Sequence, residues 1–137
     1  MADIEGLRAV AAAVPDAELY CDANGGWQLG DARRFLAATS EHDYVIEQPC
    51  ASLRECLLLR SDARRPMVLD ESVETVADVM QAAAGGIDGI TIKIARVGGV
   101  TPARVIRDVA VGLGMRVTVE DTGGADIDTA AMAHLSI

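Results

Sequence analysis

Apolar positions along the chain fall into two alternating patterns. Short apolar runs that read as buried strands occur at 18–22, 44–49, 66–71, 89–95 and 115–121. Longer segments between them, together with residues 3–14 and the last residues of the chain, have the composition and end signals of helices. Strands that alternate with helices pair in parallel through right-handed crossovers. The pattern therefore predicts an α/β fold.

Polar residues and glycines mark where the expected helices begin and end. Ser52 and Glu55 have the spacing of a capping box, so a helix is expected to start there. Glycine pairs or single glycines near 85 and 114 are typical of helix ends. Four further helices are expected to begin at Asp31, Ser72, Thr101 and Asp126.

Composition narrows the classes of function. The 137 residues suffice for one domain, half of them are hydrophobic, and the net charge is −9. An acidic chain without clustered Lys and Arg argues against a nucleic-acid surface, because phosphate contacts need such clusters. The negative charge is compatible with a cation site or with plain solubility.

The cysteines indicate a reducing environment. Cys21, Cys50 and Cys56 are odd in number and show no C-x-x-C spacing, which favours neither a disulfide framework nor a zinc site. No apolar run approaches the length of a membrane span, and the first residues carry acids where a signal peptide has a basic region. We expect a cytoplasmic protein without a membrane partner.

Charged residues recur at the ends of the predicted strands. In chain order they are Asp22, Glu47, Asp70, Lys93 and the pair Glu120–Asp121. The carboxyl ends of parallel strands open on one face, where active sites lie, so three carboxylates followed by a lysine are expected to converge. A hard divalent cation relieves their mutual repulsion, and Mg²⁺ prefers such oxygen ligands. The spacing predicts a metal site for chemistry on an anionic substrate.

Each of these residues taken singly has an ordinary explanation. A lone acid at a strand end is more often a loop or capping residue, and a lone lysine is usually on the surface. Lys93, however, lies inside the apolar run ITIKIA, where an idle lysine is costly to bury. The metal interpretation depends on the acids occurring together in matching positions.

Four motifs carry a resemblance to a known family. DANGGW, IEQP, VLDES and KIARVGGVTPAR occur in this order at 22–27, 46–49, 68–72 and 93–104. In type and spacing the sequence resembles the enolase superfamily from residue 1 to 137. A lysine on the strand after the three acids is similar to the muconate lactonizing enzyme subgroup, in the mandelate racemase/muconate lactonizing enzyme C-terminal barrel domain.

The resemblance implies a metal-dependent reaction. Asp22, Glu47 and Asp70 would bind Mg²⁺, with Mn²⁺ as a substitute, and Lys93 would be the acid/base. The family abstracts the proton α to a carboxylate and stabilises the resulting enediolate on the metal. As a base Lys93 must be neutral, and a nearby divalent charge with partial desolvation would lower its pKa.

The resemblance also implies supporting and substrate-binding residues. Asn24 and Glu71 would support the metal ligands. EQPC, VLDES, KIARVGGVT and VEDTGG together are most similar to cis-3-hydroxy-L-proline dehydratases, so a small carboxylate, in particular a cyclic amino acid, is the expected substrate. Glu120 or Asp121 would bind its cationic amine, although an N-cap role is equally compatible. Racemisation, epimerisation and cycloisomerisation remain open, because the same site supports all of them.

The resemblance covers part of a barrel. A (β/α)₈ barrel takes about 250 residues, and these motifs match its third to seventh strands. The capping domain, the first two strands, the last strand and the Lys-x-Lys of the second strand have no counterpart. We expect a partial TIM barrel that exposes two sheet edges and an apolar interior, is inactive alone, and derives from a homo-oligomeric parent.

Other classes remain as alternatives. A receiver-like phosphoacceptor domain is also short, acidic and five-stranded, but it needs adjacent acids after its first strand and a lysine on its last. A dinucleotide-binding unit is weaker still, because no G-x-G-x-x-G follows a strand. A non-catalytic βα fragment is the third alternative, and the sequence alone leaves it open.

Overall fold

Five parallel strands form one sheet, and their order in the sheet follows their order in the chain. The computed structural model describes residues 2–120 and 123–136. The strand order β1-β2-β3-β4-β5 confirms the predicted α/β fold. The strands are β1 (Tyr20–Asp22), β2 (Val45–Glu47), β3 (Met67–Leu69), β4 (Gly89–Lys93) and β5 (Arg116–Glu120).

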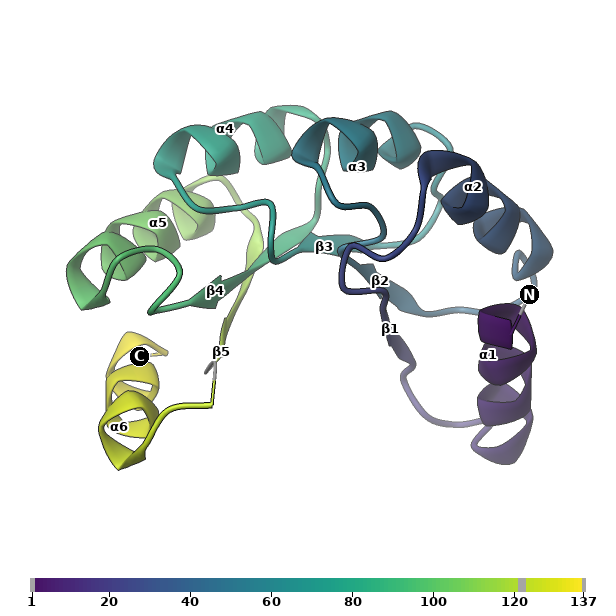
Figure 1. The fold of residues 1–137 in the computed structure, drawn as a ribbon, viewed down its shortest axis with the longest axis horizontal. Helices are drawn as coiled ribbons and strands as arrows, with labels where there is room; N and C mark the ends of the chain where they lie inside the picture. Colours follow the sequence, from purple (N-terminus) through teal and green to yellow (C-terminus); the bar gives the residue numbers. More distant parts are fainter. Residues whose placement is uncertain (1, 121–122, 137) are drawn as a thin grey trace.

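The helices lie on the outside of a curved sheet. Figure 1 shows an arch with the strands on its inner side, α1 and β1 at one foot, and β5 and α6 at the other. A sequential parallel order differs from doubly wound folds, in which the strand order reverses, so the receiver and dinucleotide-binding alternatives are excluded. The helices are α1 (Ala2–Ala13), α2 (Leu29–Ala38), α3 (Leu53–Arg60), α4 (Val76–Ala84), α5 (Val100–Gly112) and α6 (Asp126–Leu135).

The hydrophobic core fills the space between the sheet and the helices. On the convex face of the sheet, Ile46, Leu69 and Ile90 are fully buried, and they belong to one cluster with helix residues such as Leu59 and Val79. Burying a side chain of this size contributes about 1.5–3 kcal/mol. This layer holds the strands in place and leaves the opposite face of the sheet free for polar residues.

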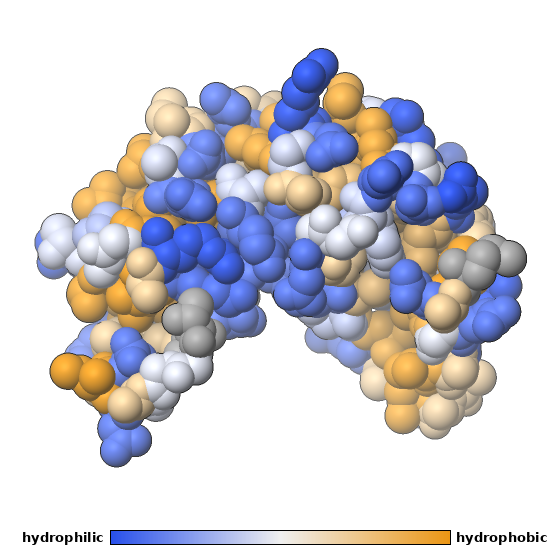
Figure 2. All heavy atoms as spheres, viewed as in Figure 1, coloured by the Kyte–Doolittle hydropathy of each residue, from blue (hydrophilic) through white to orange (hydrophobic). Residues whose placement is uncertain are grey.

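The concave face of the sheet is mainly polar, which corrects the expected apolar interior. Strand residues alternate between faces, so the neighbours of the buried isoleucines on β4, Thr91 and Lys93, point inward, as do Glu47 and Thr118 on their strands. Figure 2 shows hydrophilic residues gathered along the hollow of the arch. Most apolar side chains of the strands point to the helices, and Val45 and Val68 are the apolar residues that share the inward phase with Glu47.

The expected helix start at Ser52 is confirmed. The Ser52 hydroxyl accepts a hydrogen bond from the backbone N–H of Glu55 at 3.3 Å and donates to its carboxylate at 2.6 Å. The first of these bonds satisfies one of the backbone donors that the first helical turn leaves open, and the second joins the two side chains.

The expected start at Asp126 is also confirmed, because α6 begins there, whereas the other three are wrong in detail. Asp31 lies inside the first turn of α2 and pairs with Arg34 instead of capping. Ser72 bonds to Gln48, and Thr75 caps α4 in its place. The residues that precede α2 and α5 are Gln28 and Gly99, in place of the expected Asp31 and Thr101.

Candidate functional site

The strand ends bring the predicted residues to one end of the concave face. Asp22 and Glu47 are direct register partners across β1 and β2, Asp70 immediately follows β3, and Lys93 ends β4. All four positions share the inward phase of their strands. The expected placement of these side chains on neighbouring strand ends is therefore observed.

Asp70 lies in a compact ion-pair cluster. Its side chain is almost fully buried, and one carboxylate oxygen accepts a hydrogen bond from Lys93 Nζ at 2.5 Å. Arg96 pairs with the other oxygen. The two cations keep 17% and 20% of their side-chain exposure, so they compensate the buried carboxylate while remaining in reach of solvent.

Lys93 is a cation in this arrangement. The hydrogen bond to Asp70 is the largest cause that raises its pKa, and the charge of Asp70 adds to it, against an opposing contribution from partial burial. This is the reverse of the lowered pKa expected from a divalent neighbour, because a carboxylate here occupies the nearest position to Nζ. In this state Lys93 holds its proton, and Asp70 stabilises the charged form.

Arg96 is a site residue that the sequence reasoning missed. It lies in the loop after β4, three residues beyond Lys93, within KIARVGG. A loop arginine carries no periodicity that marks it as inward-facing. The signal that could have indicated Arg96 is its position three residues after Lys93, the basic residue at the strand end that follows the three strand-end acids.

Glu47 is held by a hydroxyl group. Its side chain is buried, and Thr91 Oγ1 donates a hydrogen bond to Oε1 at 2.5 Å. Burial is the first cause that raises the pKa of Glu47, and the negative charge of Asp22 raises it further. Burial and Glu47 also raise the pKa of Tyr20 on the same face. Negative charge is thus in excess between β1 and β2.

The remaining predicted residues occupy varied positions. The Asn24 backbone N–H donates to Asp22 Oδ1 at 2.8 Å, and Asn24 adopts a φ of 48°. Oε2 of Glu71 is a buried oxygen without a hydrogen-bond partner in the described part of the chain. Glu120 is exposed and is the register partner of Lys93. Asp121 lies outside the described residues.

The carboxylates do not form a ready coordination cluster. Within residues 2–120 and 123–136, no three His, Cys, Asp or Glu side chains are grouped so that they could hold one ion. Asp70 is turned to its two cations and Glu47 to Thr91. The chemistry of the donors still fits a hard cation: three carboxylates on adjacent strand ends, with an orphaned buried oxygen of Glu71 beside them.

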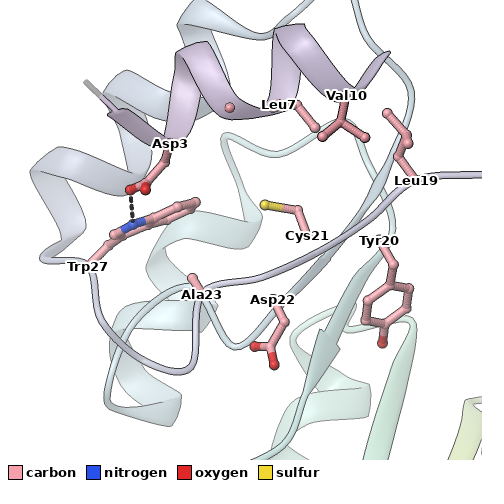
Figure 3. A pocket seen from close by; sticks show the side chains of 10 residues that line it. Asp3, Leu7, Val10, Leu19, Tyr20, Cys21, Asp22, Ala23 and Trp27 are labelled. Atoms are coloured by element: carbon pink, nitrogen blue, oxygen red, sulfur yellow. Dashed lines mark hydrogen bonds between the residues drawn. The ribbon is translucent and has the colours of Figure 1, made fainter. Parts of the chain in front are cut away.

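A separate cavity lies under α1 on the other side of β1. It measures about 410 Å³, and its lining includes Leu7, Cys21 and Trp27. Figure 3 shows Cys21 and Trp27 on the side of α1, where Trp27 Nε1 donates to Asp3 at 3.0 Å, whereas Tyr20 and Asp22 point the opposite way. The cavity nevertheless borders one strand-end acid, because Asp22 and Tyr20 are also among its lining residues.

Among the helices that the structure describes, none combines the length and the apolar character needed to cross a membrane.

The curved sheet and its strand-end acids define a segment of a parallel α/β barrel with its polar site at the carboxyl ends of the strands. The family model described as "Enolase C-terminal domain-like" matches residues 1–137. The chain belongs to this family, and the resemblance drawn from its four motifs is confirmed.

Relatives of the chain are enzymes of this superfamily. A cis-3-hydroxy-L-proline dehydratase of Roseibium aggregatum is 38% identical over 136 residues, which is 98% of this chain and 37% of the dehydratase. A hydrophobic dipeptide epimerase of Roseobacter litoralis is 35% identical over 141 residues, which cover 96% of this chain and 41% of the epimerase. The chain thus spans about two fifths of the length of these relatives.

Solved structures agree with the fold. A mandelate racemase/muconate lactonizing enzyme from Roseovarius nubinhibens ISM superposes with a TM-score of 0.93 at 37% identity, over 98% of this chain and 38% of that one. A member of the enolase superfamily from the same organism, complexed with magnesium, gives 0.90 at 35% identity over 98% and 37%. The matched region corresponds to the curved sheet and its helices.

Proposed function

We propose that the strand-end residues of this chain serve Mg²⁺-dependent abstraction of the proton α to a carboxylate. Asp22, Glu47 and Asp70 are the proposed ligands of Mg²⁺, or of Mn²⁺, and Lys93 is the proposed acid/base. The observation that carries the proposal is the placement of these four side chains on four consecutive parallel strand ends, in a chain that belongs to the enolase family.

A divalent cation bound there would supply the positive charge that stabilises the anion left when the α-proton departs. The protein residues do the rest. Lys93 Nζ lies beside Asp70 at the edge of the site and keeps access to solvent, so it can give or take a proton at the substrate α-carbon. Arg96 retains a positive charge next to Asp70 and favours an anionic substrate group.

For the outcome of the reaction we propose dehydration of a small cyclic amino acid. The support is the dehydratase relative, which is named for cis-3-hydroxy-L-proline and matches nearly the whole chain. Glu120 or Asp121 would pair with the cationic amine, since Glu120 is exposed on the concave side next to Lys93. Epimerisation is the second candidate, supported by the dipeptide epimerase relative.

The test follows the α-proton directly. The chain is incubated in D₂O with Mg²⁺ and cis-3-hydroxy-L-proline, and NMR records both deuterium incorporation at the α-carbon and formation of the dehydration product. Lys93→Arg is the matched control, because an arginine keeps the charge beside Asp70 but does not exchange a proton near neutral pH.

The results separate the candidates. Exchange that requires Mg²⁺ and is lost in Lys93→Arg supports the proposal, and exchange without product supports epimerisation over dehydration. Absence of exchange in a chain that binds the cation agrees with the expectation that this chain is inactive alone, and it supports the third alternative, a non-catalytic βα unit. Exchange that is unchanged in Lys93→Arg contradicts the role of Lys93.

A further inference from the structure

Gln48 is a fully buried amide that directly follows Glu47. Its backbone has a φ of 32°, in the left-handed region that residues other than glycine rarely adopt. Its N–H donates to the carbonyl of Val68 at 3.0 Å, and its carbonyl accepts from the N–H of Gly25 at 2.7 Å. The main chain of Gln48 therefore joins the loop after β1 to β2 and β3.

The side chain of Gln48 extends the connection to the end of β3. Oε1 accepts hydrogen bonds from the Asp70 N–H at 2.9 Å, and from the N–H and hydroxyl of Ser72 at 3.3 Å and 3.1 Å. Nε2 donates to the Cys50 carbonyl at 2.8 Å, with Cys56 Sγ at 3.9 Å. Both ends of the amide are satisfied, so its orientation is fixed.

These contacts place one residue at the junction of all three acid-bearing strand ends. Gly25 is three residues beyond Asp22, Glu47 is the preceding residue, and Asp70 is held through its own N–H. We propose that Gln48 is a positioning residue that sets the spacing of the three carboxylates for a shared cation. This inference rests on the proposed function and assigns a role to a residue that touches neither metal nor substrate.

The chemistry of the amide explains why other side chains would serve less well. A methionine has similar length but would leave the N–H groups of Asp70 and Ser72 without an acceptor. A glutamate would keep the acceptor, yet its second oxygen would face the Cys50 carbonyl and add negative charge beside Glu47. A neutral amide of this length donates to the Cys50 carbonyl and at the same time accepts from Asp70 and Ser72.

The test measures cation binding separately from stability. Mn²⁺ binding is followed by electron paramagnetic resonance in the wild-type chain, in Gln48→Met and in Gln48→Asn. The asparagine tolerates a positive φ and retains the amide, but it is one methylene shorter and withdraws from Asp70. If Gln48→Met does not fold, Gln48→Asn is therefore the variant that tests the proposal.

The matched control is Thr39→Val. Thr39 is also fully buried and hydrogen-bonded, to the Phe35 carbonyl and the Tyr44 hydroxyl, both at 2.7 Å, and it directly follows α2. Its loss is expected to lower stability without changing the Kd for Mn²⁺. A purely structural role of Gln48 would produce the same result as this control.

Each outcome decides between the proposals. We expect Kd for Mn²⁺ to rise at least tenfold in both Gln48 variants and to stay within twofold of wild type in Thr39→Val. A Kd within twofold of wild type in Gln48→Asn overturns the positioning role and leaves the proposed metal site standing. A wild-type chain that binds no Mn²⁺ overturns the proposed metal site, and the role of Gln48 falls with it.

Discussion

Replacing Asp70 by asparagine removes the negative charge that holds two cations at the end of β3. The side chain is almost fully buried, and both carboxylate oxygens are engaged, one by Lys93 and one by Arg96. Asparagine has nearly the same shape and keeps the backbone N–H that donates to Gln48. The substitution therefore tests the charge and leaves the packing in place.

The expected loss follows from the burial of the cluster. Removing one partner of a fully buried pair costs about 3–5 kcal/mol, because the remaining charge is left uncompensated. Lys93 and Arg96 keep 17% and 20% exposure, so water reaches them in part and the loss falls below that range. We expect Asp70→Asn to lower the free energy of unfolding by about 2–3 kcal/mol without metal.

Urea unfolding at neutral pH in the presence of EDTA measures this change. With a slope of about 1–3 kcal/mol per molar urea, the midpoint is expected to fall by roughly 1–3 M. The control is Asp62→Asn, whose partner Arg33 lies at 2.8 Å but whose pair is about half exposed, so the loss stays below about 1 kcal/mol. A midpoint for Asp70→Asn equal to that of Asp62→Asn would refute the account of the cluster.

Three further outcomes follow from the contacts. Lys93 is the only lysine of the chain, so its reductive methylation can be followed by mass spectrometry. Methylation should be several-fold faster in Asp70→Asn than in wild type, because the ion pair with Asp70 is lost. Equal rates would mean that the ion pair is not populated. In the folded chain at pH 8, Cys50 and Cys56 should resist Ellman's reagent, because both thiols are buried and the reagent cannot reach them. Burial also raises the pKa of both thiols, that of Cys56 to about 12. Rapid reaction of both cysteines without denaturant would contradict their place in the core. Ser52→Ala should lower the free energy of unfolding by about 1 kcal/mol in urea titrations through loss of the N-cap bond to Glu55, and an unchanged midpoint would show that this cap contributes nothing.

The positions of the site residues could be predicted because a charged residue occurs at or near the end of each apolar run. Asp22, Glu47 and Lys93 are the last residues of their strands, and Asp70 follows its strand directly. Register is a property of pairing between strands, and no single run encodes it. Asp22 is the register partner of Glu47 on β2, and Glu47 is the register partner of Val68 on β3. Asp70 therefore lies two residues beyond the position on β3 that pairs with Glu47.

The polar inner face and the ion-pair cluster were harder to foresee. In GITIK the alternation is visible, with Thr91 and Lys93 between buried isoleucines, but an apolar run of this length is also compatible with burial on both faces. Arg96 reaches Asp70 from a loop, and its direction depends on the backbone after β4. The alternation of apolar and polar residues within a strand predicts which side chains share a face. A contact made by a loop residue such as Arg96 depends on how the loop folds against the rest of the chain.

Helix starts show the same limit at short range. Ser52 was predicted correctly because its partner Glu55 is close in sequence. Ser72 was not predicted correctly, because its hydroxyl donates to the side chain of Gln48, which follows the neighbouring strand β2. Thr75 caps α4 instead. A capping residue can be recognised from sequence only when no tertiary partner competes for its side chain.

The central claim, that these strand ends form a cation site, is tested most directly by titrating Mg²⁺ while following thermal unfolding. A cation that binds only the folded chain stabilises it by RT ln(1 + [L]/Kd), which is about 1.4 kcal/mol at ten times Kd, or a rise in Tm of roughly 3–5 °C. The account predicts this rise in the wild-type chain and its loss in Asp70→Asn. A Tm that does not respond to Mg²⁺, or that rises equally in Asp70→Asn, would contradict it.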